Sequence, residues 1–119
     1  MTDYEKFLLE FNLVDEEVLK ISRNMSDHIA FPKNYWVHMA PSSIHGNGIF
    51  TKINRKAWTM ICPARIGSRR TLAGRGMNHQ DVPNTVSIDF EGDIYVIAQR
   101  DITAGEELTS DYRLNMRLR

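Results

Sequence analysis

The sequence predicts a mainly β domain that follows a helical N-terminal extension. Two observations support this fold class. Apolar residues recur at helical spacing over the first thirty residues, and the chain after Pro32 consists of short β-branched and aromatic runs separated by glycine and proline. A chain of 119 residues with 42% hydrophobic residues has the size and composition of one domain. We expect a helical extension over residues 1–32, a β-rich domain over 33–112 and a short C-terminal tail over 113–119.

The helices are predicted from capping signals and apolar spacing. Thr2 and Glu5 have the spacing of a capping box. The apolar residues of this first helix recur three and four positions apart: Tyr4, Phe7, Leu8 and Phe11. A second helix is expected after Asp15, which can serve as its N-cap. Both helices are expected to pack on the domain and to present their acidic residues to solvent.

The strands are predicted to be short. Tyr35–Met39, Ile49–Thr51 and Trp58–Cys62 have strand-like composition, and the last of these runs ends before Pro63. The clearest hairpin joins Val86–Phe90 to Ile94–Ala98 through the turn Glu91-Gly92-Asp93. Residues 107–110 are expected to form the last strand.

Basic and acidic residues are segregated, although the formal net charge is zero. Between Asp27 and Asp81 the chain carries eight basic residues and no acidic one, whereas from Asp81 to Tyr112 it carries eight acidic residues and only Arg100 as a basic one. We favour the interpretation that the two segments neutralise each other in the fold. The alternative is a nucleic-acid surface, which would bind with a steep salt dependence.

Several classes of protein lack their signatures here. No apolar run reaches the ~20 residues of a membrane helix, and the N-terminus has no basic region typical of a signal peptide, so we expect an intracellular, cytoplasmic protein without a membrane partner. The lone Cys62 cannot form an internal disulfide, and the four histidines lack zinc-site spacing, so we expect no metal. The common hydrolase and nucleotide-binding motifs are absent from the sequence.

Three segments carry candidate functional residues. Two glycines, Gly46 and Gly48, flank Asn47 in a segment where backbone amides can approach a ligand. Asn78 and His79 begin a polar loop, and Tyr112 follows the expected last strand. Taken alone, the glycine segment is equally well explained by a tight turn, whereas a solvated loop is the favoured explanation for Asn78 and His79 and a packed edge residue the more frequent case for Tyr112.

The order of the segments is more informative than any one of them. The chain reads Ile44-x-Gly46-x-Gly48-Ile49-Phe50, then Arg75-Gly76-Met77-Asn78-His79 with Pro83-Asn84, then Gly105-Glu106-Glu107-Leu108-Thr109-x-Asp111-Tyr112. Over residues 36–112 this order resembles the SET-domain family of protein-lysine methyltransferases, in a minimal microbial or viral type without a zinc-binding tail. The resemblance implies a SET-type β-clip of small twisted sheets with a C-terminal pseudoknot.

The resemblance also implies a cofactor and a reaction. The cofactor would be S-adenosyl-L-methionine, and the reaction would be methyl transfer to the neutral amine of a lysine on a protein substrate. The implied cofactor-binding residues are Gly46, Asn47, Gly48, Asn78, His79 and Tyr112. Among them, Asn78 would bind the amino-acid end of the cofactor, and His79 would contribute mainly backbone groups near the adenine. Tyr112 would be the catalytic residue that orients the amine and the methyl group.

The sequence departs from the family pattern in ways that keep an alternative open. Only 29 residues separate Gly48 from Asn78, and the motif that often supplies a second active-site tyrosine is replaced by a stretch with Trp58, Cys62 and Gly67. The alternative is therefore a non-catalytic SET-like module that binds a protein partner. Because so short a chain leaves the site under-covered, we expect either the tail over 113–119 or a second copy in a homodimer to close it.

Overall fold

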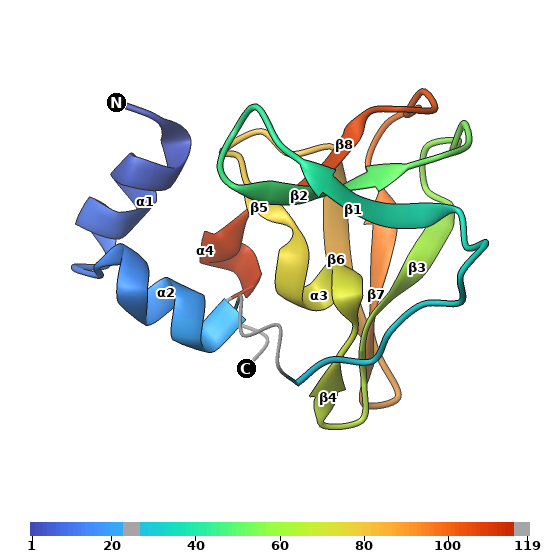
Figure 1. Cartoon of the computed structure of the whole chain (residues 1–119), viewed down its shortest axis with the longest axis horizontal. Coiled ribbons are helices and arrows are strands. Elements are labelled where there is room, and N and C mark those ends of the chain that lie inside the picture. The colour runs from blue at the N-terminus through green and yellow to red at the C-terminus, as the bar shows by residue number, and fades with distance from the viewer. Residues whose placement is uncertain (23–26, 116–119) are drawn as a thin grey trace.

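The computed structural model describes residues 1–22 and 27–115, and it contains two small four-stranded sheets with helices packed at one side (Figure 1). The first sheet has the strand order β1 (Val37–Pro41), β2 (Asn47–Thr51), β8 (Glu107–Ser110) and β5 (Asn78–His79). The second has the order β4 (Arg69–Arg70), β3 (Met60–Ile66), β7 (Asp93–Ala98) and β6 (Thr85–Phe90). The helices are α1 (Asp3–Glu10), α2 (Asp15–Ser22), α3 (Leu72–Gly76) and α4 (Tyr112–Asn115). The predicted fold class is confirmed.

The first sheet brings the three candidate segments onto neighbouring strands. Strand β2 begins within the glycine segment and contains Asn47 and Gly48, β5 consists of Asn78 and His79, and β8 leads into Tyr112. Strand β8 lies between the other two, antiparallel to β2 and parallel to β5. A parallel pair needs a long connection, which here contains the β6–β7 hairpin. The sheet order therefore gathers residues that are far apart in the sequence.

The predicted hairpin is confirmed, with a tighter turn than expected. Strands β6 and β7 pair from Thr85 with Ala98 to Phe90 with Asp93, so Asp93 belongs to the strand. The turn consists of Glu91 and Gly92, which have φ values of 53° and 89°. Positive φ at both central residues is the conformation that matches the twist of a two-residue hairpin.

The third predicted strand differs from the observed one at both ends. Strand β3 begins at Met60, after the exposed Trp58, and continues through Pro63 to Ile66. The pairing of β3 with β7 shifts register on both sides of the Cys62–Pro63 step. Such irregularities allow a strand to include proline, because its missing N–H is then not needed by a regular ladder. The prediction that the strand ends before Pro63 is wrong for this reason.

Two separate hydrophobic clusters hold the fold together. The main core lies between the sheets and α3 and includes Ile49, Ile61, Val96 and Leu108, which are all fully buried. The lone Cys62 belongs to the same core, and burial raises the pKa of its thiol to about 12. The second cluster contains Tyr4, Phe7, Val18 and Tyr112. It attaches the N-terminal helices to the last described helix, beside the first sheet (Figure 1).

The N-terminal helices form as predicted, with one difference at Asp15. The capping box between Thr2 and Glu5 is present in both directions. Helix α2 begins at Asp15 itself, and the carboxylate of Asp15 accepts a hydrogen bond from Tyr4 Oη at 2.5 Å. No helix in the described part of the chain is long and apolar enough to span a membrane.

The two oppositely charged segments contact each other. Backbone N–H groups of the basic segment donate hydrogen bonds to carboxylates of the acidic segment. Asp93 accepts from the backbone N–H of Gly67, and Asp101 accepts from that of Ala57. The carboxylates of the acidic segment thus also anchor turns of the basic one.

Candidate active site

The segment around the two glycines folds around the side chain of Ser42. Its Oγ accepts from the backbone N–H of Ile44 at 2.9 Å and donates to Glu107 Oε1 at 2.6 Å. The backbone N–H of Ser42 donates to the carbonyl of Gly46, whose φ of 48° favours glycine. Ser42 therefore ties the start of this turn to strand β8.

The space beside Gly48 is filled by protein atoms. A Cβ atom added at Gly48 would lie 2.2 Å from Glu107 Oε2 and 3.1 Å from Asn78 Nδ2. In this structure the missing side chain therefore makes room for a carboxylate and an amide of the same chain. Sequence reasoning missed Ser42 and Glu107, although the second glutamate of the Gly105-Glu106-Glu107 motif was the available signal.

The side chain of Asn78 is fully buried, and only the nitrogen of its amide has hydrogen-bond partners among the described residues. Nδ2 faces four acceptors, namely Ser42 Oγ at 3.0 Å, the carbonyls of His45 and Asn47 at 3.0 and 3.3 Å, and Glu107 Oε2 at 2.7 Å. Acceptors on this side fix which end of the amide is the nitrogen. The opposite atom, Asn78 Oδ1, is buried and has no hydrogen-bond partner among the described residues. Buried acceptors without a donor are rare, so this oxygen marks a place for a ligand donor.

His79 uses its side chain as well as its backbone. The imidazole is fully buried, Nδ1 accepts from the backbone N–H of Tyr112 at 2.9 Å, and Nε2 lies 3.0 Å from Asp81 Oδ1. The implied role of His79 involved mainly its backbone, so the side-chain bond to Tyr112 was not foreseen. This bond joins residues that are 33 positions apart.

Tyr112 lies at the centre of the second cluster. Its hydroxyl donates to the carbonyl of Met77 at 2.5 Å, and 7% of the residue is exposed. The rings of Tyr4 and Phe7 approach its ring edge-on, with centroids 6.2 and 5.4 Å away. Tyr4 also stacks on His45 of the glycine segment, at a centroid distance of 5.1 Å. Helix α1 therefore covers the face where the three segments meet.

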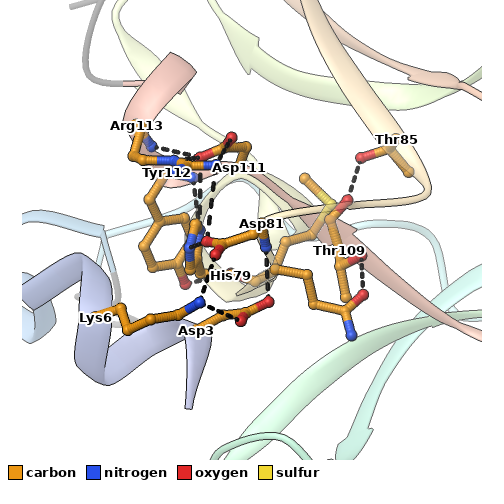
Figure 2. A network of polar contacts seen from close by, with 11 residues as sticks. Asp3, Lys6, His79, Asp81, Thr85, Thr109, Asp111, Tyr112 and Arg113 are labelled. Atoms are coloured by element: carbon orange, nitrogen blue, oxygen red, sulfur yellow. Dashed lines mark hydrogen bonds and ion pairs between the residues drawn. The ribbon is translucent and has the colours of Figure 1, made fainter. Parts of the chain in front are cut away.

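Charged side chains lie around His79 and Tyr112 (Figure 2). Asp81 lies 3.1 Å from Lys6, and this contact together with those to His79 and Arg113 holds the pKa of the Asp81 carboxyl below its usual value. Burial would raise the pKa of Asp111, but Arg113, 2.7 Å away, lowers it below the ordinary value. Both carboxylates are therefore ionised at neutral pH.

The stretch that replaces the second tyrosine motif lies away from this site. Trp58 is 69% exposed with a φ of 65°, Cys62 is in the main core, and Gly67 lies in the turn between β3 and β4. By contrast, the expected site residues contact one another. Asn78 contacts the glycine segment, and His79 contacts Tyr112.

Comparison with known proteins supports the family resemblance. The family model of the SET domain matches residues 5–113. A solved structure of a Plasmodium falciparum protein proposed to be a histone methyltransferase is similar with a TM-score of 0.55 and 19% identity, over 66% of this chain and 94% of that one. A humanized mutant of the Chaetomium thermophilum Polycomb Repressive Complex 2, bound to the inhibitor GSK126, is similar with a TM-score of 0.57 and 18% identity, over 66% of this chain and 15% of that one.

At these identities the two solved structures show a shared fold. The comparison with curated proteins found no match. The family model, by contrast, covers nearly the whole chain, from α1 to the start of α4. The chain belongs to the SET-domain family.

Proposed function

We propose that this protein is a protein-lysine N-methyltransferase that uses S-adenosyl-L-methionine to methylate a neutral lysine amine of a protein substrate. The observation that carries the proposal is the convergence of three sequence segments on one site. In that site Asn78 Oδ1 is buried without a hydrogen-bond partner among the described residues, and the backbone N–H of Tyr112 donates to His79. Family membership supports the proposed reaction class, and this convergence supports the choice of residues.

The residues present fit the amino-acid end of such a cofactor. Asn78 Oδ1 has no donor among the residues that the structure describes, and an ammonium group has donors to give. The carbonyls of His45 and Asn47 and the carboxylate of Glu107 accept from Nδ2 on the other side of this amide, so they orient Oδ1 toward the place where the ammonium group would bind. The bound cofactor would supply an electrophilic methyl group on a positively charged sulfur.

The protein's own contribution is to bind, to orient and to exclude water. A free lysine has a pKa of about 10.4, and only its neutral amine is a nucleophile. Apolar, aromatic surroundings disfavour the ammonium form, so the amine can lose its proton without a strong protein base. Tyr112 can accept or donate a hydrogen bond through its hydroxyl and would orient the amine, which is a positioning effect on the reacting atoms.

A second candidate function is a SET-like module that binds a protein partner without turnover. Two features favour it. The stretch with Trp58, Cys62 and Gly67 contributes nothing to the site, and the Tyr112 ring is covered by Tyr4 and Phe7. A methyltransferase of this design must therefore move helix α1 to load its ligands and return it before methyl transfer, whereas a binding module need not.

Two measurements on the same preparation separate the candidates. Calorimetry with S-adenosyl-L-methionine should give roughly one site per chain for the wild type and weaker binding for Asn78→Ala, because that variant lacks the unpaired acceptor. Incubation with labelled cofactor and a mixed cell lysate should place the label on lysine. Binding without labelling would favour the non-catalytic module. Absence of binding at millimolar cofactor would contradict both the cofactor and the reaction.

A further inference from the structure

We propose that Asp81 is a positioning residue for Tyr112, that it acts through the imidazole of His79, and that helix α1 holds it in place. Only one part of the inference, the expected effect of Asp81 on turnover, rests on the proposed function. Its structural part concerns a chain of contacts that runs from α1 to the backbone of Tyr112 (Figure 2).

The contacts of His79 require one tautomer. Nδ1 accepts the backbone N–H of Tyr112, so Nδ1 must carry a lone pair rather than a proton. In a neutral ring the proton is then on Nε2, which lies 3.0 Å from Asp81 Oδ1 and donates to it. Asp81 therefore stabilises the tautomer with the proton on Nε2, whose Nδ1 can accept the hydrogen bond from the backbone N–H of Tyr112.

Asp81 is itself held from several directions. Lys6 Nζ lies 3.1 Å from Oδ2, and Arg113 Nη2 lies 3.7 Å from Oδ1. The backbone N–H of Asp81 donates to Asp3 Oδ2 at 2.8 Å. Because Asp3 and Lys6 both belong to α1, this helix fixes the main chain and the carboxylate of Asp81 together. The lowered pKa of Asp81 keeps that carboxylate an acceptor.

The position of the Tyr112 backbone controls the position of its hydroxyl. Tyr112 begins the short helix α4, and its hydroxyl reaches the carbonyl of Met77. A His79 ring protonated on Nδ1 would oppose the N–H of Tyr112 with a second donor, so this hydrogen bond would be lost and the start of α4 displaced. A misplacement of about 1 Å in a positioning group can cost roughly a hundredfold in rate.

The test compares Asp81→Ala with Asp81→Asn, in the full chain. The alanine variant removes the acceptor for Nε2–H, so kcat should fall at least about tenfold while the cofactor dissociation constant stays within about threefold. The asparagine variant keeps an oxygen acceptor and should recover most of the lost kcat. If Asp81 had a purely structural role, Asp81→Asn would not restore kcat, and Asp81→Ala would weaken cofactor binding together with kcat.

A matched pair of ion-pair variants tests the contribution of α1. Lys6→Met removes the cation that faces Asp81 and should lower kcat severalfold. Arg100→Met breaks an exposed ion pair with Glu106 at 3.0 Å, away from His79, and should leave kcat unchanged. Equal effects of the two variants on kcat would contradict the role assigned to α1.

Nitrogen NMR of the His79 ring decides the structural part without any activity. The wild type should carry its ring proton on Nε2, and Asp81→Ala should shift the tautomer balance together with the amide signal of Tyr112. A wild-type ring protonated on Nδ1 overturns the proposal, as does a folded Asp81→Ala variant with wild-type kcat or with unchanged signals. If the wild type transfers no methyl group, the proposed function fails separately, and these spectra still decide whether Asp81 positions Tyr112.

Discussion

At the scale of single residues, Glu107 organises the part of the site that the glycines were expected to form. Its two carboxylate oxygens accept from Ser42 and Asn78, and Oε2 occupies the volume that a Gly48 side chain would need. This arrangement leaves Asn78 Oδ1 as the unpaired acceptor. The position of the Glu107 carboxylate therefore favours glycine at position 48, whatever the site binds.

This packing predicts that Gly48 and Glu107 are energetically coupled. Gly48→Ala should lower the free energy of unfolding by about 1–3 kcal/mol, because the new Cβ overlaps the carboxylate. In a Glu107→Ala background the overlap disappears, so the same substitution should cost much less. Denaturant unfolding of the two single variants and the double variant measures the coupling. Additive costs would contradict the contact.

The residues of the site were more predictable than their partners. The motif order identified Asn78, His79 and Tyr112 as candidates, and the sheet gathers them. The side-chain bond of His79 to Tyr112 and the role of Glu107 depend on β8 lying between β2 and β5. That strand order is a long-range property, and no local pattern in the sequence encodes it. The assignment of all six residues to cofactor binding, and of Tyr112 to catalysis, stays a prediction.

At the scale of elements, helix α1 combines local and long-range stabilisation. The capping box satisfies its first backbone groups, but an isolated eight-residue helix is not stable in water. Phe7, which is 3% exposed, supplies the anchor through its contacts with Tyr112 and His79. The helix therefore depends on the site that it covers.

A comparison within α1 tests this dependence. Phe7→Ala should release the helix and increase hydrogen exchange at the Tyr112 amide, while the amides of β3 and β7 keep their protection. Leu9→Ala is the matched control, because Leu9 is 68% exposed on the same helix and its loss should change stability by less than about 0.5 kcal/mol. Uniform loss of protection across the sheets after Phe7→Ala would show that α1 is not a separable element.

The elements that local signals define were predicted well. The capping box and the tight turn of the β6–β7 hairpin depend on residues close in sequence. Strand β3 was cut short at Pro63 because a proline signal was read without its partner strand, whose irregular pairing accommodates it. The short helix α4 begins after Asp111, whose Oδ1 accepts from the backbone N–H of Arg113 at 3.0 Å, and the bond from Tyr112 to His79 adds a long-range contact at its start.

At the scale of the whole molecule, the N-terminal helices cover the site in the described structure. The expected covers were the tail or a second copy of the chain. Of the tail, Arg113 pairs with Asp111, Leu114 is 43% exposed, and Met116 and Leu118 lie outside the described residues. Closure by α1 was not expected, because the sequence gives no measure of which surface a short amphipathic helix selects.

The homodimer stays a prediction that sedimentation of the full chain can test. Apolar side chains are exposed on the second sheet, notably Met60, Ile88 and Phe90 at 47%, 46% and 61%. Monomeric proteins rarely expose contiguous apolar patches of large area. If the chain dimerises through this sheet, Phe90→Asp should shift sedimentation to the monomer without lowering cofactor affinity. A wild type that sediments as a monomer at all concentrations would contradict the dimer.

The central claim is that binding and methyl transfer depend on different residues of one convergent site, and Tyr112→Phe tests it most directly. The substitution removes one hydroxyl and keeps the ring that packs against Tyr4 and Phe7. The account predicts a fall in methyl transfer to lysine of at least about tenfold, with the cofactor dissociation constant within a small factor of wild type. Full activity in a folded Tyr112→Phe protein would contradict the account.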